Sequence, residues 1–258
     1  MKAVRIDLSR DLDRLEIHTF ADLHLGDKSC DVQLIKQRIE EVQDNPNAYC
    51  ILNGDIINNA TKTSVSDCYA EELKPMEQIK LFMELFEPIK NKILALTNGN
   101  HENRTYIREG VDITELCARQ LGIDDRYSKE GILIFLRFGK QNTDHHELPV
   151  RYVIYATHGS GGGRKEGAKA IRLADMASIV DADIYIHSHT HLPMIMKQAY
   201  YRTDVINSKF QLVDKLFVNT SSYLNYGGYG QSLEFKPNSK DTPVIYLDGT
   251  RKRFTAKL

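Results

Sequence analysis

Cysteine is scarce in this sequence, and the cysteines are widely spaced. The four cysteines lie far apart, form no CxxC pair and lack the density of a disulfide-stapled secreted domain: Cys30, Cys50, Cys68 and Cys117. Long apolar runs are also missing. The first twenty residues carry charges throughout, unlike a signal peptide, and no stretch is long enough to span a bilayer. We therefore expect a soluble cytoplasmic protein with reduced thiols and no membrane partner.

The sequence has no excess of one charge. Lys and Arg number 34 and Asp and Glu 35, which gives a formal net charge of -1. Without a global basic field, tight nonspecific binding to nucleic acid is not expected. An anionic ligand must be held by local groups, so a phosphorylated small molecule, a nucleotide or a nucleic-acid end remains open as a substrate.

The pattern of apolar residues predicts an α/β protein. At 258 residues the chain is expected to form a single domain over residues 1–258. Short β-branched runs alternate with segments of helical period. The expected strands are Leu15 to Phe20, Tyr49 to Asn53, Lys92 to Thr97, Ile132 to Phe138, Arg151 to Thr157, Asp183 to His187, Leu216 to Asn219 and Val244 to Leu247. The expected helices are Val32 to Gln43, Leu73 to Ile89 and Asp112 to Leu121.

Four further segments are expected to lie outside these elements. Gly159 to Gly167 is read as a flexible basic loop, Gln141 to Leu148 as a polar connector and Tyr223 to Tyr229 as a loop that could add an aromatic wall to a site. Tyr200 to Asp214 alternates polar and apolar residues, and could form an edge hairpin or a dimer contact.

Five clusters of metal-competent residues follow expected strands. Ligands of open α/β sheets bind at the carboxyl ends of strands, where separate strand ends converge. In D-x-H and H-x-H the two side chains point the same way on an extended chain. Each cluster alone is more often structural, but five in succession at strand ends predict a shared site. The clusters contain Asp22 and His24, Asp55, Asn100 and His101, His158, and finally His189 and His191.

Together these motifs resemble the calcineurin-like metallophosphoesterase superfamily. D-x-H, G-D-x-x-D/N, G-N-H-D/E, a lone His after a strand and G-H-x-H run from Asp22 to His191, about two thirds of the chain. The resemblance implies a four-layer αββα sandwich, with two facing mixed sheets flanked by helices. It further implies two divalent metal ions bridged by Asp55. One would be held by Asp22, His24, Asp55 and His191, and the other by Asp55, Asn100, His158 and His189.

The ligand types and the resemblance together imply a hydrolase chemistry. Carboxylate, imidazole and amide ligands without thiolate suit Mn²⁺, which we expect first, with Fe, Zn, Co, Ni or Mg as alternatives. Two such ions can share a hydroxide that attacks a phosphoester in line. His101 is assigned to neither metal and is the candidate general acid. The family orients this His with a carboxylate, in whose place Asn58 stands, so Asn58 is expected to orient a less basic His101.

Other departures from the family pattern bear on the substrate. Asn59 and Asn98 stand where phosphoprotein phosphatases carry Arg, which favours a phosphodiester over a dianionic monoester. Nearby basic residues could still reach a phosphate: Arg104, Arg108, Arg164 and Lys165. Ser188 replaces the usual Gly before H-x-H, and we expect this change to be tolerated. The basic segment Gly159 to Arg172 is either a phosphate-contacting flap or an ordinary solvated loop.

Several alternatives stay open. Within the enzyme class the alternative is a phosphomonoesterase or protein phosphatase, and outside it a catalytically silent binding scaffold, which the retained ligand set argues against. A DNA-processing nuclease shares the motifs, but the neutral charge argues against it. The remaining histidines are read as structural. His18 and His187 are expected to be packed and hydrogen-bonded, and His145 and His146 to lie in a polar loop.

Overall fold

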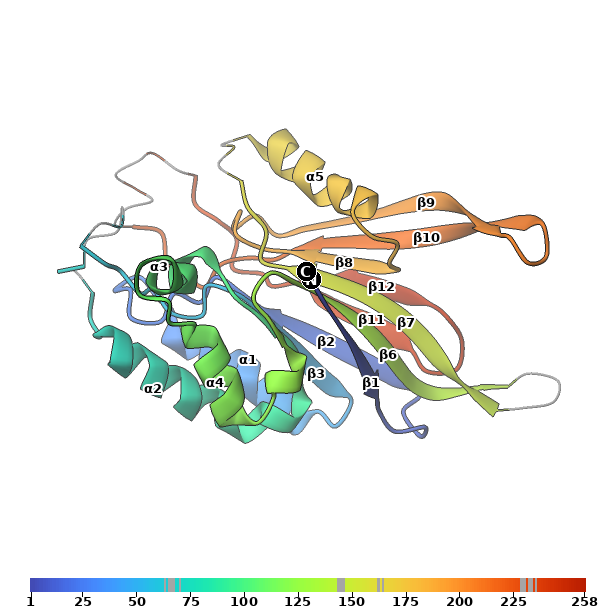
Figure 1. Ribbon diagram of the computed structural model, residues 1–258, viewed down its shortest axis with the longest axis horizontal. Coiled ribbons are helices and arrows are strands. Elements are labelled where there is room, and N and C mark those ends of the chain that lie inside the picture. The colour runs from blue at the N-terminus through green and yellow to red at the C-terminus, as the bar shows by residue number, and fades with distance from the viewer. Residues whose placement is uncertain are drawn as a thin grey trace.

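The chain folds into two facing β-sheets with helices on both outer sides (Figure 1). We describe it from a computed structural model that covers residues 1–62, 64, 68–69, 71–142, 147–161, 163, 165–227, 231, 234 and 236–258. Within these residues there are two six-stranded sheets. The predicted αββα arrangement is therefore confirmed.

The first sheet, in the order β12-β11-β2-β3-β4-β5, contains the N-terminal strands of the site. Neighbours from β2 to β5 run parallel, whereas β11 runs antiparallel to β2 and to β12. Side chains along β3 and β4 are almost entirely buried because both faces of the sheet are covered. The strands are β2 (Arg14–Phe20), β3 (Ala48–Asn53), β4 (Ile93–Thr97), β5 (Tyr127–Ser128), β11 (Val244–Asp248) and β12 (Phe254–Lys257).

The second sheet has the order β1-β6-β7-β8-β10-β9. In it β7, β8 and β10 run parallel, while β6 is antiparallel to β7 and β9 to β10. Its strands are β1 (Lys2–Asp7), β6 (Gly131–Asn142), β7 (Glu147–Thr157), β8 (Ile184–His187), β9 (Met194–Asp204) and β10 (Lys209–Asn219).

Helices cover the outer face of each sheet. The first sheet packs against α1 (Val32–Asp44), α2 (Pro75–Phe86) and α4 (Ile113–Leu121) through one apolar cluster. A second cluster, with Ile17, Ile154 and Val218, fills the space between the sheets. The second sheet is covered by α5 (Glu166–Asp175), through a third cluster. Within the described residues, no helix is both long and apolar enough to span a bilayer.

Two helices form where none was predicted. One is α3 (Asn100–Glu109), of which Glu102 is the buried residue, so the segment carries little apolar period. The other is α5, whose first residues belong to the segment predicted as a basic loop. The strands β6 and β7 extend into the predicted connector at 141–148, of which residues 143–146 lie outside the described residues. For 200–214, which was expected to form an edge hairpin or a dimer contact, the structure shows the hairpin, since β9 pairs antiparallel with β10 at the edge of the sheet.

Candidate metal centre

The predicted site residues come from five strand ends and meet in one place. Asp22 and Asp55 each follow by two residues the ends of the parallel strands β2 and β3, and Asn100 follows β4 at the start of α3. His158 comes directly after β7, and the two histidines at 189 and 191 come just after β8. The loops between the sheets thus bring residues from both sheets together, as the strand-end pattern predicts.

One group of donors surrounds Asp22. The imidazole Nε2 of His191 lies 3.1 Å from Asp22 Oδ1 and 3.4 Å from Nε2 of His24. Asp22 Oδ1 is buried and has no hydrogen-bond partner within the described residues. A buried carboxylate oxygen without a hydrogen bond, close to two imidazole nitrogens, is the arrangement that a cation between them would satisfy.

The second group surrounds Asp55, which is 1% exposed. Its Oδ2 lies 3.3 Å from Nε2 of His158, 3.8 Å from Nε2 of His101 and 4.0 Å from Nε2 of His24. The amide oxygen of Asn100 lies 2.7 Å from Nδ1 of His189 and 3.1 Å from Nε2 of His158. One carboxylate therefore lies between both groups, the position expected of a bridging ligand.

The backbone of these residues is unusual. Eight described residues other than glycine have positive φ, and five of them belong to the predicted ligand set: Asp22, His24, Asp55, His189 and His191, with φ from 50° to 66°. Left-handed backbone costs a residue with a Cβ roughly 1–2 kcal/mol, although Asp and His tolerate it better than most. Strain of this kind persists where the surroundings impose it, typically at functional sites.

Glu102 holds the loop of Asp55 in place, a role that the sequence analysis missed. Its carboxylate accepts hydrogen bonds from the main-chain N–H groups of Asp55 at 3.1 Å, Ile57 at 3.0 Å and Gly99 at 2.9 Å. Burial, together with the charge of Asp55, raises the pKa of Glu102 to about 7. A Cβ on Gly99 would lie 2.1 Å from Asp55 Oδ1, so only glycine allows this approach. A Glu three residues after the helix N-cap was the available signal.

Ser188 has a specific partner. Its hydroxyl accepts a hydrogen bond of 2.7 Å from the amide of Asn53, which also donates to the carbonyl of Thr157 at 2.8 Å. The oxygen of the same amide accepts from Thr97 at 2.8 Å. Asn53 thus joins the ends of β3, β4 and β7 to the residue preceding His189.

His101 meets Asn58 through the main chain, which corrects the predicted pairing. Its Nδ1 lies 2.6 Å from the carbonyl oxygen of Asn58, whereas the Asn58 side chain donates to Glu71 at 3.0 Å. The expectation that the side-chain amide of Asn58 orients His101 is therefore wrong. A main-chain carbonyl occupies that position, because the chain turns back beside α3, and it accepts a hydrogen bond from Nδ1–H whatever side chain stands at 58.

The charges of the site are coupled. Burial would raise the pKa of the Asp55 carboxyl, but the imidazoles of His158 and His101 hold it well below its usual range. Burial would likewise lower the pKa of His158, but Asp55 raises it to about 10. Burial lowers the pKa of His24 and His189, so both stay neutral with lone pairs free to bind a cation.

The donor set fits divalent cations. Among the described residues, three groups have potential ligand atoms within 4.8 Å of one another: Asp22, His24 and His191; His24, Asp55 and His101; and Asp55, His158 and His189. They offer carboxylate oxygen and imidazole nitrogen without thiolate, the chemistry of borderline divalent metals.

Some of the residues expected to select for the charge of the substrate are hydrogen-bonded inside the protein. The Asn59 side chain donates to the carbonyl of His101 at 2.7 Å, and that of Asn98 accepts from Thr114 at 2.7 Å. Of the basic candidates, Arg104 comes nearest, since it donates to the carbonyl of Asn58 at 3.3 Å.

Two of the other three basic candidates are described, and both lie at the surface. Arg108 and Lys165 are exposed, and Arg164 lies outside the described residues. The basic segment instead reaches the site through Lys169 of α5, which donates to the carbonyl of Thr190, between two predicted ligands, at 2.7 Å.

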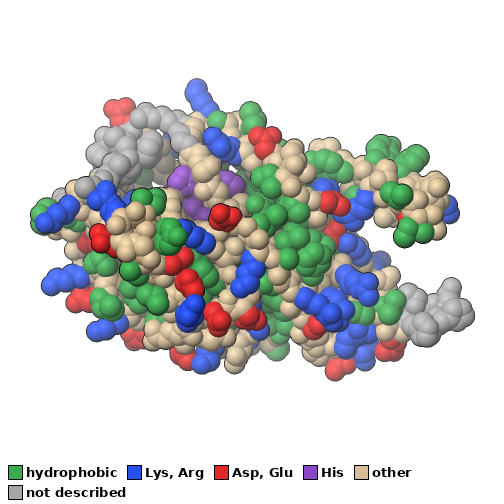
Figure 2. All heavy atoms as spheres, viewed as in Figure 1, with side chains coloured by type: hydrophobic (Ala, Val, Ile, Leu, Met, Phe, Trp, Pro, Cys, Tyr) green, Lys and Arg blue, Asp and Glu red, His purple; other side chains and the backbone are tan. Residues whose placement is uncertain are grey.

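A groove of about 470 Å³ opens beside Asn100 and His158. Tyr106, Lys129 and Tyr155 form part of its wall. Figure 2 shows histidine side chains within a hollow of this face of the molecule. The hollow leaves room for a substrate next to the donor groups.

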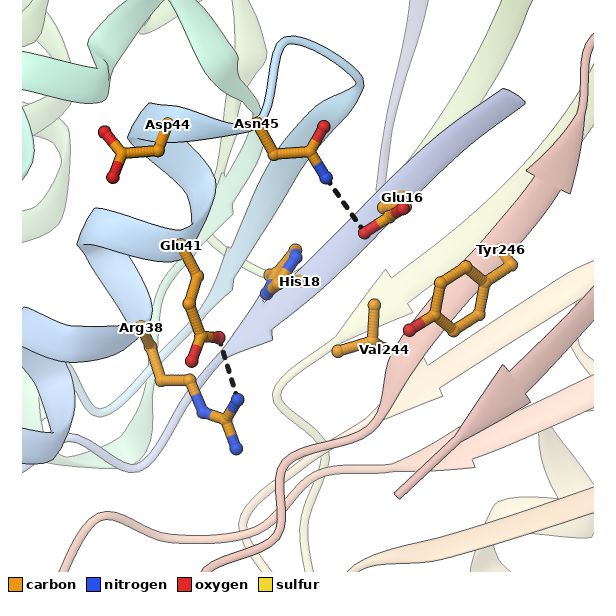
Figure 3. A pocket seen from close by; sticks show the side chains of 8 residues that line it. All are labelled: Glu16, His18, Arg38, Glu41, Asp44, Asn45, Val244 and Tyr246. Atoms are coloured by element: carbon orange, nitrogen blue, oxygen red, sulfur yellow. Dashed lines mark hydrogen bonds and ion pairs between the residues drawn. The ribbon is translucent and has the colours of Figure 1, made fainter. Parts of the chain in front are cut away.

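The remaining histidines only partly follow expectation. His187 is buried and its Nδ1 lies 2.8 Å from the amide oxygen of Asn219, as predicted. His18 is buried in a separate groove of about 460 Å³ between α1 and β11, but its ring makes no hydrogen bond to any described residue (Figure 3). Burial lowers its pKa, so it stays neutral there, and the predicted hydrogen bond is wrong. His145 and His146 lie outside the described residues.

The sequence also matches a model of a known family. The calcineurin-like phosphoesterase model matches residues 16–193, more than half of the chain, and this range contains every predicted ligand. The chain belongs to the calcineurin-like phosphoesterase family. Membership indicates metal-dependent hydrolysis of a phosphoester, and the three His/Asp groups are its candidate metal-binding residues.

Solved structures of this family resemble the chain at low identity. The calcineurin-like phosphoesterase YfkN from Bacillus subtilis is 14% identical, with a TM-score of 0.44, over 95% of this chain and 90% of that one. A Vps29 single mutant from Entamoeba histolytica is 13% identical with a TM-score of 0.43, over 94% of this chain and 90% of that one. The nuclease MPE from Pseudomonas putida is 10% identical with a TM-score of 0.37, over 93% and 87%. A search of curated proteins found no significant match.

Proposed function

We propose that the protein is a two-metal phosphodiesterase acting on a nucleotide, a cyclic nucleotide or a nucleic-acid end. One cation, for which we propose Mn²⁺, would be held by Asp22, His24, Asp55 and His191. The other would be held by Asp55, Asn100, His158 and His189. When bound, such a pair activates water and stabilises the negative charge of the reacting phosphoryl group. The four described cysteines are free, which fits our proposal of a cytoplasmic location.

The observation that carries the proposal is the position of Asp55. Its Oδ2 lies within 4.0 Å of imidazole nitrogens of His24, His101 and His158. A buried carboxylate shared by two donor groups is what a bridged pair of cations requires. The complete ligand set argues against a silent scaffold, because no predicted ligand has been replaced.

His101 is proposed as the general acid. The carbonyl of Asn58 accepts a hydrogen bond from Nδ1–H, which fixes the ring and leaves Nε2 directed toward Asp55, 3.8 Å from Oδ2. A proton on Nε2 would pass to the leaving alkoxide. Burial lowers the pKa of His101, so its imidazolium gives up that proton more readily than an exposed one.

The proposal of a diester substrate rests on missing cationic side chains. Asn59 and Asn98 are both buried and satisfied internally, so neither offers charge to a second phosphate anion. A diester carries one negative charge and needs fewer such partners than a monoester. The tyrosines of the neighbouring groove could stack a nucleobase, which supports the nucleotide class.

One observation favours a second candidate, a phosphomonoesterase. Arg104 is close to the Asn58 carbonyl that holds His101, so one guanidinium is available near the site. Arginine binds a dianionic phosphate with two parallel hydrogen bonds.

The two candidates are separated by loading the metal-free protein with Mn²⁺ and comparing bis-p-nitrophenyl phosphate with p-nitrophenyl phosphate. Asp55→Asn serves as the blank. Diester turnover that disappears in the variant supports the proposal. Dominant monoester turnover would replace it with the second candidate, and no turnover of either ester would return the scaffold interpretation.

A further inference from the structure

The β9–β10 hairpin extends well beyond the neighbouring strand β8 (Figure 1). Its pairing continues from Met194 and Asn219 at the base to Asp204 and Lys209 at the tip. In Figure 1 the outer half of both strands lies beyond the ends of the neighbouring strands, at the side opposite α2 and α3. Figure 2 shows a notch between the outer half of the hairpin, which we call the arm, and the body of the molecule.

The inner face of the second sheet is apolar. This face continues along the arm beyond the part that the first sheet covers. Near the base Leu216 and Val218 are buried between the sheets. The same face continues with Leu212 and Phe210 on β10, and Tyr201 lies opposite Leu212 on β9. These three side chains are 63%, 71% and 73% exposed.

The exposed apolar side chains lie close together in sequence and register at the outer end of the arm. The rings of Tyr201 and Phe210 contact each other edge to face at 5.3 Å, and the tip adds Val205 and Ile206, which are 85% and 93% exposed. Since an aromatic side chain presents roughly 150–250 Å², the five side chains leave on the order of 600 Å² of apolar surface uncovered. That is at the upper limit of the largest patch on a typical monomer, about 300–600 Å².

The outer edge of β9 is also unpaired. Within the described residues β9 pairs with β10 alone, so one row of its N–H and C=O groups faces outward. Among its side chains only Lys197 and Arg202 are cationic, and it contains no proline, so the edge is weakly protected against pairing with another strand.

We propose that this arm binds a second copy of the chain. Two arms related by a two-fold axis can pack with their apolar patches facing each other, because a two-fold contact brings the same surface to both sides. The apolar area approaches the roughly 800 Å² that each partner of a standard interface buries, and polar atoms of the two arms supply the rest. On the patch side of the arm, Lys197 and Asp214 form an ion pair of 2.9 Å. Their charges cancel, so two identical surfaces would not repel each other there.

A double variant with a matched control tests the proposal. Sedimentation equilibrium of the full chain from low to high micromolar concentration should give a dimer for the wild type. Phe210→Lys together with Leu212→Lys should give a monomer, because each lysine would bury an unpaired charge in the contact. Leu116→Lys on α4, where the native leucine is 57% exposed, should remain dimeric. Thermal unfolding shows whether each variant is folded.

Hydrogen exchange supplies a second measurement that needs no variant. Amides of β9 should become more protected as concentration rises, whereas those of β1, at the opposite edge of the same sheet, should not change. A wild type that stays monomeric throughout, including one that binds lipid vesicles as a monomer, would overturn the proposal. So would a dimer in which β9 gains no protection.

Discussion

At the scale of single residues, the contact between His101 and the Asn58 carbonyl separates the roles of two residues that the sequence analysis had paired. The main-chain oxygen lies 2.6 Å from the imidazole, and the side chain of Asn58 is bonded to Glu71 instead. Replacing the Asn58 side chain should therefore leave the orientation of His101 intact. Asn58→Asp would place a second carboxylate beside Glu71 rather than beside the imidazole.

We expect His101→Ala to lower kcat by about 100-fold or more while the protein keeps its metal, because a general acid contributes 10²–10⁴-fold. Asn58→Ala should change kcat only a few-fold. Metal content by plasma emission spectrometry and steady-state kinetics of both variants check this. Equal losses of kcat in the two would show that the side chain at 58 does act on catalysis.

Glu102→Gln should loosen the loop that carries Asp55. The carboxylate accepts hydrogen bonds from three main-chain N–H groups. A glutamine amide has one acceptor oxygen, and its NH₂ group would face a main-chain N–H, which is also a donor. A loss of about 1–3 kcal/mol in unfolding free energy is expected, with weaker metal binding. Urea denaturation and a metal titration measure the two effects. Glu109→Gln, exposed at the end of the same helix, is the control, and a similar change there would refute the role given to Glu102.

At the scale of elements, Asp31 fixes the start of α1. Its carboxylate accepts from the Leu34 N–H at 3.1 Å and pairs with Lys240 at 2.5 Å. The hydrogen bonds from Lys240 and from the Leu34 N–H lower the pKa of Asp31. Since the folded pKa is below the unfolded one, the contribution is fully present above about pH 4 and is lost as the pH falls through the folded value.

Asp31→Ala should then cost about 1 kcal/mol at neutral pH, the usual effect of removing a helix cap. The difference from the wild type should shrink as the pH is lowered below 4. Asp31→Asn retains an acceptor for the Leu34 N–H and should cost less. Urea midpoints of the wild type and both variants, measured from pH 7 downward, test this expectation. A constant difference in stability over that range would rule out a role of the Asp31 charge.

The elements that could be predicted from the sequence are those whose apolar pattern reflects burial. Strands such as β3 and β4, buried along their length, and helices such as α1, with one apolar face, were predicted to within a few residues. By contrast, β1 shows exposure on alternate residues at an edge, and the outer half of β9 is held by pairing with β10 rather than by a core. No apolar period marks α3, because its first turn serves the site.

More of the candidate site than of the fold could be predicted from the sequence. The predicted ligands at strand ends need only the order of strands to converge, and the seven residues do lie close together. The roles of Glu102 and of the Asn58 carbonyl could not be predicted, because both depend on main-chain groups that the letter code does not show. Glu71 and Asn53 were missed for the same reason: their partners lie across loops.

At the scale of the whole molecule, the donor residues connect the two sheets. Asp22, Asp55 and Asn100 follow strands of one sheet, and His158 and His189 follow strands of the other. Cations held by residues of both sheets would stabilise the folded state relative to the unfolded chain, since the ligands are brought together only on folding.

Removing divalent cations with a chelator should therefore lower the Tm by several degrees. Binding at 100-fold excess over Kd contributes roughly 2.7 kcal/mol, and 1 kcal/mol shifts the Tm by roughly 2–4 °C at this size. Returning Mn²⁺ should restore the Tm. Calorimetry of the wild type beside Asp55→Asn tests the assignment, because a variant that responds to chelation as fully as the wild type would place the stabilising metal elsewhere.

The left-handed backbone at five of the predicted ligands means that activity and thermal stability make opposite demands at the same positions. Glycine would relax the chain at each of them, and each glycine would remove a donor. A library of this protein selected only for heat resistance without metal should therefore drift toward glycine at these five positions and become inactive as it becomes more robust. Conversely, a designer who wants a more stable enzyme should keep the predicted ligands and look for stability at Ser208 and Glu234, which among the described residues are left-handed and lie outside the loops of the predicted ligands.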